Sequence, residues 1–199
     1  MEMRKIKSFI KVGLSFCWHP ILSVKLYKKG SRKIYLRGGI QINTCKPLNV
    51  GKNVSIGKDA RFLFISSYYG SKYKPSVIIG DNVFIGNRFS ILSAAPIEIG
   101  KNTLIASDVM ISSENHGINP ESAETYGAVP LDAEPVEIGD GCWLGEKSCI
   151  MPGVVLGRRC IVAASAVVTK SFPPYSLVAG VPAKVIKVYN FATHQWESV

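Results

Sequence analysis

The side chains best suited to chemistry lie together in a polar stretch near the middle of the chain. His116 is one of only three histidines, and it directly follows Glu114 and Asn115. A neutral imidazole can take the proton of a hydroxyl group near pH 7, which is the task of a general base. His116 is therefore the candidate base, while a surface or hydrogen-bonding role is the ordinary alternative for a lone histidine. Glu114, Asn115 and Glu124 could orient the imidazole, contact an acceptor, or be loop residues without either role.

The chain around this stretch repeats an apolar residue every six positions. Fifteen positions, in four runs, are large and apolar, and glycine or alanine follows ten of them. These positions are Val50, Ile56, Phe62, Ile79, Ile85, Ile91, Ile99, Ile105, Ile111, Ile138, Leu144, Ile150, Leu156, Val162 and Val168. A period of six fits neither a helix nor a long strand. It predicts short strands separated by tight turns, with each coil of the chain stacked on the coil before it.

Three such sides would close one coil, so the repeat predicts an all-β fold of about five coils, spaced by roughly 4.8 Å. A meander of hairpins is the alternative, but it would show a period of two and wider turn spacing. The step from Ile111 to Ile138 spans 27 residues, nine more than a coil of eighteen, so residues 112–137 are predicted to leave the coils as a loop. Loops on a rigid scaffold are where function tends to lie, and His116 stands at the root of this one.

The repeat resembles that of the hexapeptide-repeat acyltransferases, which have the pattern [Ile/Leu/Val]-Gly-x4. Residues 136–187, "VEIGDGCWLGEKSCIMPGVVLGRRCIVAASAVVTKSFPPYSLVAGVPAKVIK", are similar to the closing segment of the galactoside, maltose and nodulation O-acetyltransferases. With residues 50–116, the resemblance covers about two thirds of the chain. It implies a left-handed parallel β-helix, a homotrimer, and acetyl-CoA as the donor substrate. It also implies that His116, seventeen residues after Ile99 as in the family, deprotonates the acceptor hydroxyl for a direct transfer.

The resemblance implies further site residues. The family holds the acceptor sugar with an asparagine from an earlier coil, for which the nearest candidate is Asn87, displaced by one position. Coenzyme A, which is long and anionic, needs backbone amides along its arm and basic residues at its phosphates. The candidates are Trp143 at the thiol end, the backbone near Gly145 and Ala164 along the arm, and Thr169, Lys170, Lys184 and Lys187 near the adenosine and phosphates. Glu146 departs from the family's usual serine or glycine. Outer packing of Trp143, and a solvated charged face for the others, are the alternatives.

Composition predicts one folded domain with short extensions. Hydrophobic residues make up 47% of the chain and charged residues 19%. The predicted parts are a basic, partly apolar extension over residues 1–45, the β-helix over 46–182, and a short C-terminal helix and tail over 183–199. The extension predicts one or two helices broken at Pro20. Their apolar face would pack on the β-helix or rest on a membrane surface, since the apolar run is too short to cross a bilayer.

The net charge of +10 alone does not choose between a nucleic acid, a phosphorylated cofactor, an acidic glycan and an anionic membrane. A nucleic-acid partner is not expected, because no recognition-helix or RNA-binding motif is present. A metal is not expected either, because only His116 lies within the repeats, with His19 and His194 in the flanks. The five cysteines are odd in number and show no CxxC spacing, which indicates reduced core residues and a cytoplasmic protein.

Together these observations predict an O-acetyltransferase that acts on a sugar hydroxyl, with the sugar belonging to a bacterial surface polysaccharide or its precursor. Such an acceptor would place the protein at the inner face of the membrane, through its N-terminus. Two alternatives stay open. The acceptor could be a small molecule, such as a free saccharide, an antibiotic or the amino group of a nucleotide sugar. The chain could also be a catalytically silent scaffold.

Overall fold

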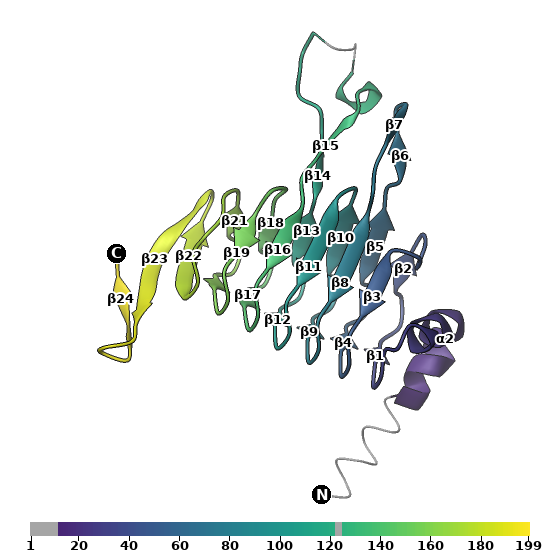
Figure 1. The fold of residues 1–199 in the computed structure, drawn as a ribbon, viewed down its shortest axis with the longest axis horizontal. Helices are drawn as coiled ribbons and strands as arrows, with labels where there is room; N and C mark the ends of the chain where they lie inside the picture. The colour runs from purple at the N-terminus through teal and green to yellow at the C-terminus, as the bar shows by residue number, and fades with distance from the viewer. Residues whose placement is uncertain (1–11, 122–124) are drawn as a thin grey trace, which may run out of the picture.

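The coils predicted from the repeat are present, and they form a three-sided prism. The structure, a computed structural model, describes residues 12–121 and 125–199. Three sheets, here named A, B and C, make the sides of the prism, and successive strands along the chain visit them in that order (Figure 1). The fold is the predicted all-β, left-handed parallel β-helix.

Each sheet is a parallel stack built from successive coils. Sheet A contains β1 (Tyr35–Leu36), β4 (Ser55–Ile56), β9 (Phe84–Ile85), β12 (Leu104–Ile105), β17 (Trp143–Leu144), β20 (Ile161–Val162) and β22 (Ser176–Gly180), followed by the antiparallel β23 (Ala183–Asn190) and β24 (Gln195–Ser198). Sheet B contains β2 (Gln41–Ile42), β5 (Arg61–Phe64), β10 (Ser90–Ser93), β13 (Met110–Ser112), β18 (Cys149–Ile150) and β21 (Val167–Val168). Sheet C contains β3 (Leu48–Val50), β8 (Ser76–Ile79), β11 (Pro96–Ile99), β16 (Val136–Ile138) and β19 (Val155–Leu156).

The apolar positions of the repeat form the core of the prism. All fifteen are buried, and none is more than 7% exposed. Each lies in register with its counterpart one coil away, as Ile85 does with Ile56 and Ile105. Small residues follow these positions because successive coils come very close at the corners. A Cβ atom at Gly86 would lie 2.5 Å from the amide nitrogen of Ser107, which leaves room only for hydrogen.

The prism begins earlier than the predicted boundary at residue 46. A first coil, from β1 to β3, lies largely within the predicted extension 1–45. Leu36 and Ile42 stand six residues apart and extend the repeat backwards, and Leu36 is buried in the core. The described coils are therefore five complete ones and a sixth, in which Phe172 makes only an isolated bridge to Leu156.

The predicted helices are present in the N-terminal extension. Residues 12–18 are helical, the helix breaks at His19, and α2 (Pro20–Lys28) begins at the proline. Leu22 and Leu26 of α2 are buried and join the core cluster of the prism, which confirms the packing alternative for this face of the helix. Part of the predicted extension, with Arg4, Lys5, Lys7 and Lys11, lies outside the described residues.

The predicted C-terminal helix over residues 183–199 is wrong. These residues instead form β23 and β24, which pair antiparallel to the last parallel strand of sheet A. Two features favour strands here. The segment is rich in β-branched and aromatic residues, and the last coil would otherwise leave an open sheet edge.

The prediction that the cysteines are core residues is correct for Cys142 and Cys160. It is wrong for Cys17, which is exposed.

Two hairpins leave the prism at the corner between sheets B and C (Figure 1). The predicted loop contains β14 (Glu114–His116), the 3-10 turn η1 (Tyr126–Ala128) and β15 (Leu131–Ala133). It lengthens a single side of one coil, between β13 and β16, rather than a whole coil. The other hairpin, β6 (Ser67–Tyr68) and β7 (Ser71–Lys72), connects β5 to β8 and was not predicted from the sequence.

Candidate active site

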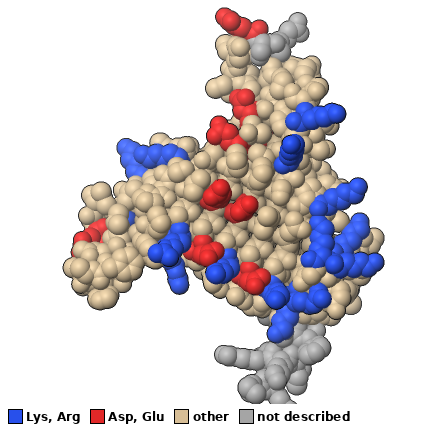
Figure 2. Space-filling view, viewed as in Figure 1, with Lys and Arg blue, Asp and Glu red and all other residues tan. Residues whose placement is uncertain are grey.

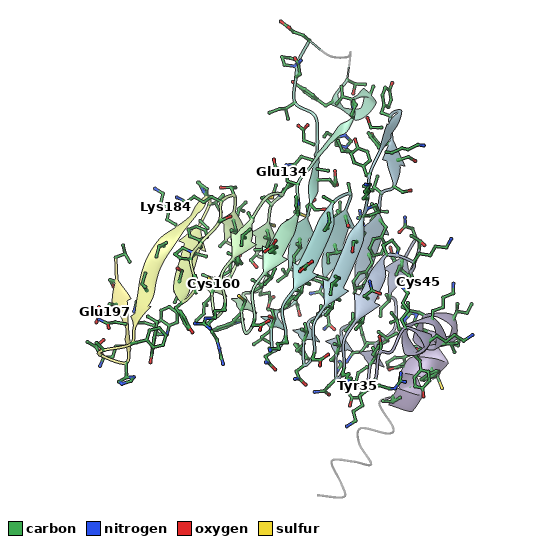
Figure 3. All side chains as sticks on the ribbon, viewed as in Figure 1. Tyr35, Cys45, Glu134, Cys160, Lys184 and Glu197 are labelled. Atoms are coloured by element: carbon green, nitrogen blue, oxygen red, sulfur yellow. The ribbon has the colours of Figure 1, made fainter. Side chains whose placement is uncertain are left out.

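His116 lies on an exposed hairpin that projects from the prism. It is the last residue of β14, pairs with Leu131 of β15, and has an exposed side chain. Figure 3 shows the side chains of this hairpin standing clear of the coils, with Glu134 at its root. The imidazole is therefore accessible to a substrate that approaches from outside the prism, as a general base must be.

Buried serines anchor the root of this hairpin. The Ser113 hydroxyl donates to the carbonyl oxygen of Ala95 over 2.8 Å and accepts from the amide nitrogens of Ala94 and Ala95. The Ser112 hydroxyl donates to the carbonyl oxygen of Glu114 over 2.7 Å. The small side chains at this corner let the hairpin leave the coil while its backbone groups stay hydrogen-bonded. The position of His116 is thus fixed by the prism.

Glu114 shares the side of β14 that carries His116, because side chains two residues apart in a strand point the same way. Its side chain is 9% exposed. Burial raises the pKa of this carboxyl above its ordinary value, and His116 opposes the shift. Asn115 is exposed, pairs with Asp132 and points to the opposite side of the strand. Of the two predicted neighbours of His116, Glu114 is the one placed to influence the imidazole.

The hairpin of β6 and β7 contributes an aromatic residue that sequence reasoning missed. The ring of Tyr68 lies 5.4 Å from the ring of His116, centroid to centroid, at an interplanar angle of 67°. This edge-to-face geometry is the one that aromatic rings favour. The signal in the sequence is the 17-residue step from Phe62 to Ile79, which is too long for one six-residue side. Tyr68 is therefore part of the surroundings of the candidate base.

Tyrosine hydroxyls tie the two hairpins together. Tyr68 donates to the carbonyl oxygen of Gly127 over 2.6 Å. The Tyr73 hydroxyl accepts from the amide nitrogen of Leu131 over 2.6 Å and donates to its carbonyl oxygen over 3.1 Å. Because Leu131 pairs with His116, Tyr73 holds the strand directly opposite the imidazole. The two hairpins therefore form one braced unit around His116.

Asn87 lies away from His116 in this chain. It follows β9 at the corner between sheets A and B, and its side-chain oxygen accepts from the amide nitrogen of Lys58 over 2.9 Å. It lines a groove of about 310 Å³ on the outer face of sheet A, together with Trp143 and Glu146. Within one chain, Asn87 is thus grouped with a predicted cofactor residue rather than with the candidate base.

Trp143 stands on the outer face of sheet A, where it is about half exposed. A second groove, of about 480 Å³, continues from it past Ile161 to Tyr189 and Trp196 of the C-terminal strands. Sequence reasoning missed these two aromatic residues because it predicted a helix there. Strand pairing places Trp143, Ile161, Leu177 and Lys187 in one row across sheet A.

A bulge brings two of the three lysines predicted near the adenosine and phosphates to the same side. Lys184 and Lys187 are three residues apart, so they would point to opposite faces of a regular strand. The pairing of β22 with β23 shifts between Leu177 and Val178, so that Lys187 pairs with Leu177 and Lys184 with Ala179. Both lysines then oppose outward-facing residues, on the face that carries Trp143. An apolar row that ends in lysines suits a long ligand with an anionic end.

The remaining predicted cofactor residues are divided between two corners. Gly145 stacks closely on Ala164 of the next coil, since a Cβ atom at Gly145 would lie 2.6 Å from the Ala164 nitrogen. Thr169 and Lys170 instead follow β21 at the corner between sheets B and C, where both are exposed. The Lys170 ammonium lies 5.8 Å from the centroid of the Phe172 ring. The predicted cofactor residues therefore do not form one site within a single chain.

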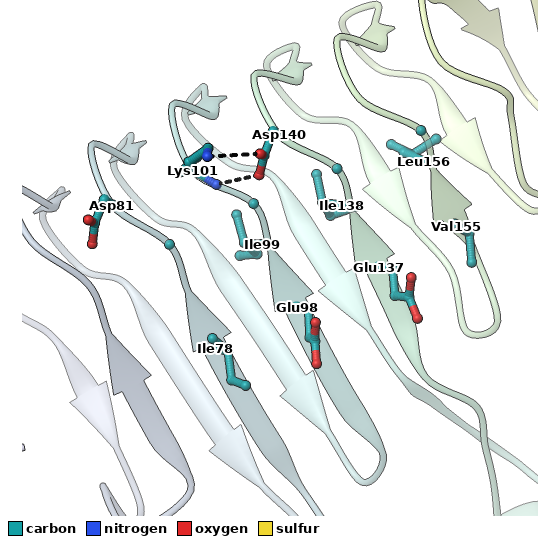
Figure 4. Close-up of a pocket in the computed structure, with 14 residues that line it drawn as sticks. Ile78, Asp81, Glu98, Ile99, Lys101, Glu137, Ile138, Asp140, Val155 and Leu156 are labelled. Atoms are coloured by element: carbon teal, nitrogen blue, oxygen red, sulfur yellow. Dashed lines mark hydrogen bonds and ion pairs between the residues drawn. The ribbon is translucent and has the colours of Figure 1, made fainter.

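The outer face of sheet C carries a groove of about 620 Å³ that no predicted site residue lines (Figure 4). Glu98 and Glu137 lie side by side on adjacent strands in this groove, and Lys101 contacts Asp140 at its edge over 3.7 Å. Like charges directly opposite one another are mildly destabilising. This acidic side of the prism contrasts with the basic residues elsewhere in the chain.

Residues 12–121 and 125–199 contain no group of three or more His, Cys, Asp or Glu arranged to hold a metal ion. No helix in these residues is long and apolar enough to cross a membrane.

The sequence matches models of hexapeptide families at two places. The model described as bacterial transferase hexapeptide (six repeats) matches residues 135–170, and the model described as hexapeptide repeat of succinyl-transferase matches residues 76–113. The chain is 35% identical to the "Putative lipopolysaccharide biosynthesis O-acetyl transferase WbbJ" of Escherichia coli K12, over 99% of each chain. It is 31% identical to the galactoside O-acetyltransferase of the same organism, over 75% of each chain.

Solved structures show the same architecture. A galactoside acetyltransferase in complex with coenzyme A superposes with a TM-score of 0.60 and 29% identity, over 71% of this chain and 64% of that chain. A hexapeptide-repeat acetyltransferase from Vibrio cholerae, in complex with acetyl coenzyme A, superposes with a TM-score of 0.58 and 25% identity, over 69% of this chain and 68% of that chain.

Proposed function

This chain belongs to the hexapeptide-repeat acyltransferases, and on that premise we propose that it transfers acetyl from acetyl-CoA to a sugar hydroxyl of a bacterial surface polysaccharide or its precursor. The observation that carries the proposal is the accessible His116 on its braced hairpin. The full-length similarity to an enzyme named for lipopolysaccharide biosynthesis supports the choice of acceptor. The acyltransferase class itself follows from the family, as does the use of acetyl-CoA.

In the proposed mechanism, His116 accepts the proton of the acceptor hydroxyl while the oxygen attacks the acetyl carbon. Acetyl-CoA supplies the acetyl group as an activated thioester. The proton on the imidazole can then pass to the departing sulfur, so no acetyl group needs to be attached to the protein. Glu114, on the same side of β14, interacts electrostatically with His116. Tyr68 would limit the movement of the ring.

We propose that the complete site lies between subunits of a homotrimer. In one chain, His116 leaves the corner between sheets B and C, whereas Trp143, Lys184 and Lys187 face outward from sheet A. Figure 1 shows β14 and β17 on opposite sides of the prism. A cyclic trimer can bring the hairpin of one copy against the sheet A row of the next. Both predicted halves of the site would then serve one reaction.

Mixing of inactive variants tests this shared site. His116→Ala lacks the base, and the double variant Lys184→Gln/Lys187→Gln lacks the basic end of the row. If the halves come from different subunits, trimers reassembled from both variants contain some intact sites and recover part of the activity. Recovery that stays at the level of either variant alone would contradict the proposal, provided that the trimers exchange subunits.

The catalytic assignment is tested by thiol release from acetyl-CoA with monosaccharides, nucleotide sugars and lipid-linked glycans as acceptors. We expect acceptor-dependent release that falls at least a hundredfold in His116→Ala, the range typical of a lost general base. His194→Ala is the matched control, because it removes an exposed histidine in the turn between β23 and β24. Full activity of His116→Ala would remove His116 from the mechanism. A wild type that is inactive with every acceptor would favour a silent scaffold.

A small free saccharide is the second candidate acceptor. The 31% identity to a galactoside O-acetyltransferase supports it. The two candidates differ in the thiol-release assay, since the first requires a polymer or lipid-linked glycan and the second does not. We also propose that the protein works in the cytoplasm at the inner face of the membrane. A lipid-linked precursor of a surface polysaccharide would be presented there.

A further inference from the structure

The charges of this chain are strongly segregated. Residues 1–58 contain 13 of the 24 Lys and Arg but only one of the 14 Asp and Glu, a net charge of +12. Residues 59–199, with 11 basic and 13 acidic residues, carry −2. Figure 2 shows most of the basic side chains in view over the end of the prism that holds α2 and the first coil, with a smaller group over the C-terminal end and the acidic ones over the middle and the projecting hairpin. The basic character of the protein therefore belongs to one end of it.

The same end exposes large apolar side chains on its helices. They are Leu14, Phe16, Trp18, Ile21, Val24 and Tyr27. Helix α2 buries Leu22 and Leu26 against the prism and turns the opposite face to solvent. Ile21 on that face is 71% exposed, although the exposure of an apolar side chain to water is unfavourable. Single exposed apolar residues are ordinary, but six within fourteen residues form a patch that calls for a partner.

Basic side chains border this patch without acidic partners in the described residues. Lys25 and Lys28 lie on the exposed face of α2 with Ile21 and Val24, at the spacing of neighbours on a helix. The ion pairs found in the described residues, Arg88 with Asp108 and Lys101 with Asp140, are elsewhere. Lysines on the same helix face as exposed apolar residues are typical of helices that lie in a membrane interface.

A groove beside the patch extends its apolar surface into the prism. It has a volume of about 350 Å³ and lies between α2 and the first coil. Trp18, Ile21 and Leu22 line it from the helices, Ile42 and Cys45 from the coil, with Lys25 also in the lining. His19, Asn43 and Thr44 add polar groups to the lining. A groove that combines apolar walls with polar groups and an ammonium group can accept hydrocarbon chains whose headgroups are anionic.

We propose that this end of the protein, formed by the helices of residues 12–28 and the first coil, docks on the surface of an anionic lipid bilayer. The charge argues for this occupant, because residues 12–50 contain seven Lys and Arg but no Asp or Glu. An anionic membrane attracts such a segment and accepts exposed Trp and Ile side chains. A trimer of prisms packed side by side presents this end of all three chains on one face, which multiplies the binding. Docking on a bilayer goes beyond acetyl transfer and does not require it.

Vesicle co-sedimentation of the full chain tests the proposal without acetyl-CoA or acceptor. We expect binding to vesicles of phosphatidylcholine mixed with phosphatidylglycerol, and at least tenfold weaker binding to phosphatidylcholine alone or at high salt. Lys25→Gln/Lys28→Gln should weaken binding to the anionic vesicles by roughly tenfold to thirtyfold. The matched control, Lys101→Gln/Lys147→Gln, removes two basic residues at corners of later coils and should change it little.

A second pair of variants tests the apolar part. Ile21→Ser/Val24→Ser should weaken vesicle binding at least tenfold, whereas Ile78→Ser/Val155→Ser, which changes an exposed Ile and Val on sheet C, should not. Absence of binding to anionic vesicles, or equal losses in test and control variants, would overturn the proposal. A change in oligomeric state on Ile21→Ser/Val24→Ser, measured by light scattering, would overturn it too, since the patch would then be a subunit contact. Unchanged thiol release with a soluble acceptor separates these outcomes from a failure of the catalytic assignment.

Discussion

The coils of the prism and the two hairpins that leave them are built on different principles. Each inward residue of a coil meets an equivalent residue above and below it, so one chemical type recurs through the stack, as Ile56, Ile85 and Ile105 do. The hairpins share no such pattern. They are held by single contacts between unlike residues, such as the hydrogen bond from Tyr68 to Gly127.

The difference assigns separate tasks to the two regions. The repeated coils supply a large apolar core in which every layer supports the next, and the free energy of unfolding should reside there. The buried apolar residues of the longer hairpin, Val129 and Leu131, lie outside the core cluster. The hairpins hold His116, Glu114 and Tyr68 in a particular arrangement. Substitutions in the coils should therefore change stability, and substitutions in the hairpins should change activity.

The largest effect on stability is expected inside the prism. Ile97 and Ile78 lie on adjacent strands of sheet C, but Ile97 is fully buried and Ile78 is 43% exposed on the outer face. Ile97→Ala should lower the free energy of unfolding by about 2–5 kcal/mol, because it removes buried methyl groups and leaves a cavity. Ile78→Ala should cost less than about 0.5 kcal/mol. Urea denaturation at one protein concentration compares them.

Equal losses in the free energy of unfolding for Ile97→Ala and Ile78→Ala would contradict this difference between core and surface. They would show that the outer face of sheet C is also buried in solution. Analytical ultracentrifugation of the Ile78→Ala variant would then reveal whether a subunit contact had been removed. An unchanged oligomer with a large loss of stability would instead show that the outer face of sheet C stabilises the single chain as much as the core does.

The next largest effect, on kcat, is expected in the hairpin of β6 and β7, which was not predicted from the sequence. Tyr68→Ala removes the ring that packs on His116 and should lower kcat by roughly twofold to tenfold, since an aromatic pair is worth about 0.5–1.5 kcal/mol and about 1.4 kcal/mol is a factor of ten. The melting temperature should stay within about 2 °C of wild type, because little apolar area is lost. Steady-state thiol release and thermal unfolding measure the two quantities.

Tyr68→Phe separates the ring from the hydroxyl. It keeps the edge-to-face contact but loses the hydrogen bond to Gly127, so most of kcat should remain. If kcat falls as much in Tyr68→Phe as in Tyr68→Ala, the effect comes from the lost hydrogen bond to Gly127 and not from the ring contact with His116. Tyr68→Ala that raises KM with kcat unchanged would assign Tyr68 to acceptor binding.

The coils could be predicted from sequence because their residues repeat. The fifteen apolar positions, and the break after Ile111, follow directly from a period that the stacked geometry enforces. The two ends could not be predicted in the same way. The first coil repeats only through Leu36 and Ile42, and the C-terminal strands depend on pairing with the edge of the last coil, which lies outside any local pattern.

The candidate site was predictable only in part, for the same physical reason. His116 could be found because it interrupts the repeat. Tyr68 could not be assigned, because its place beside His116 depends on two hairpins that leave the prism from different coils. The common face of Lys184 and Lys187 depends on a bulge, and a bulge is set by the partner strand. Contacts of this kind need the three-dimensional structure.

A smaller, pH-dependent effect is expected at Glu114. Burial raises the pKa of this carboxyl, so the folded protein holds its proton to a higher pH than the unfolded chain does. Its contribution to stability is therefore fully present below the ordinary pKa and is lost as the pH rises through the raised pKa. Glu114→Gln should consequently be more stable than wild type near neutral pH, and the gain should shrink as the pH falls. Urea denaturation between pH 4 and pH 8 measures the difference.

The control for Glu114→Gln is Glu134→Gln in the same hairpin. The Glu134 side chain is exposed, so its replacement removes no buried charge. A gain in stability at Glu114→Gln that does not vary with pH would show that the buried charge is not its cause. A loss of stability at neutral pH would show that the carboxylate has a stabilising partner in the folded protein.

The smallest effect is expected at an exposed contact between coils. Arg88 and Asp108 occupy equivalent corner positions on successive coils and form two hydrogen bonds of 2.7 Å. Arg88 lowers the pKa of Asp108, chiefly through these hydrogen bonds, so the stabilisation is present at neutral pH and is lost as the pH falls through the lowered pKa. Asp108→Asn should therefore lower stability slightly at neutral pH, and less at high salt.

Asn tolerates the positive φ of 61° at this position, so the substitution adds no backbone strain of its own. Urea denaturation at low and high salt is the measurement. A loss as large as that of Ile97→Ala would mean that the corners, and not the stacked core, hold the coils together.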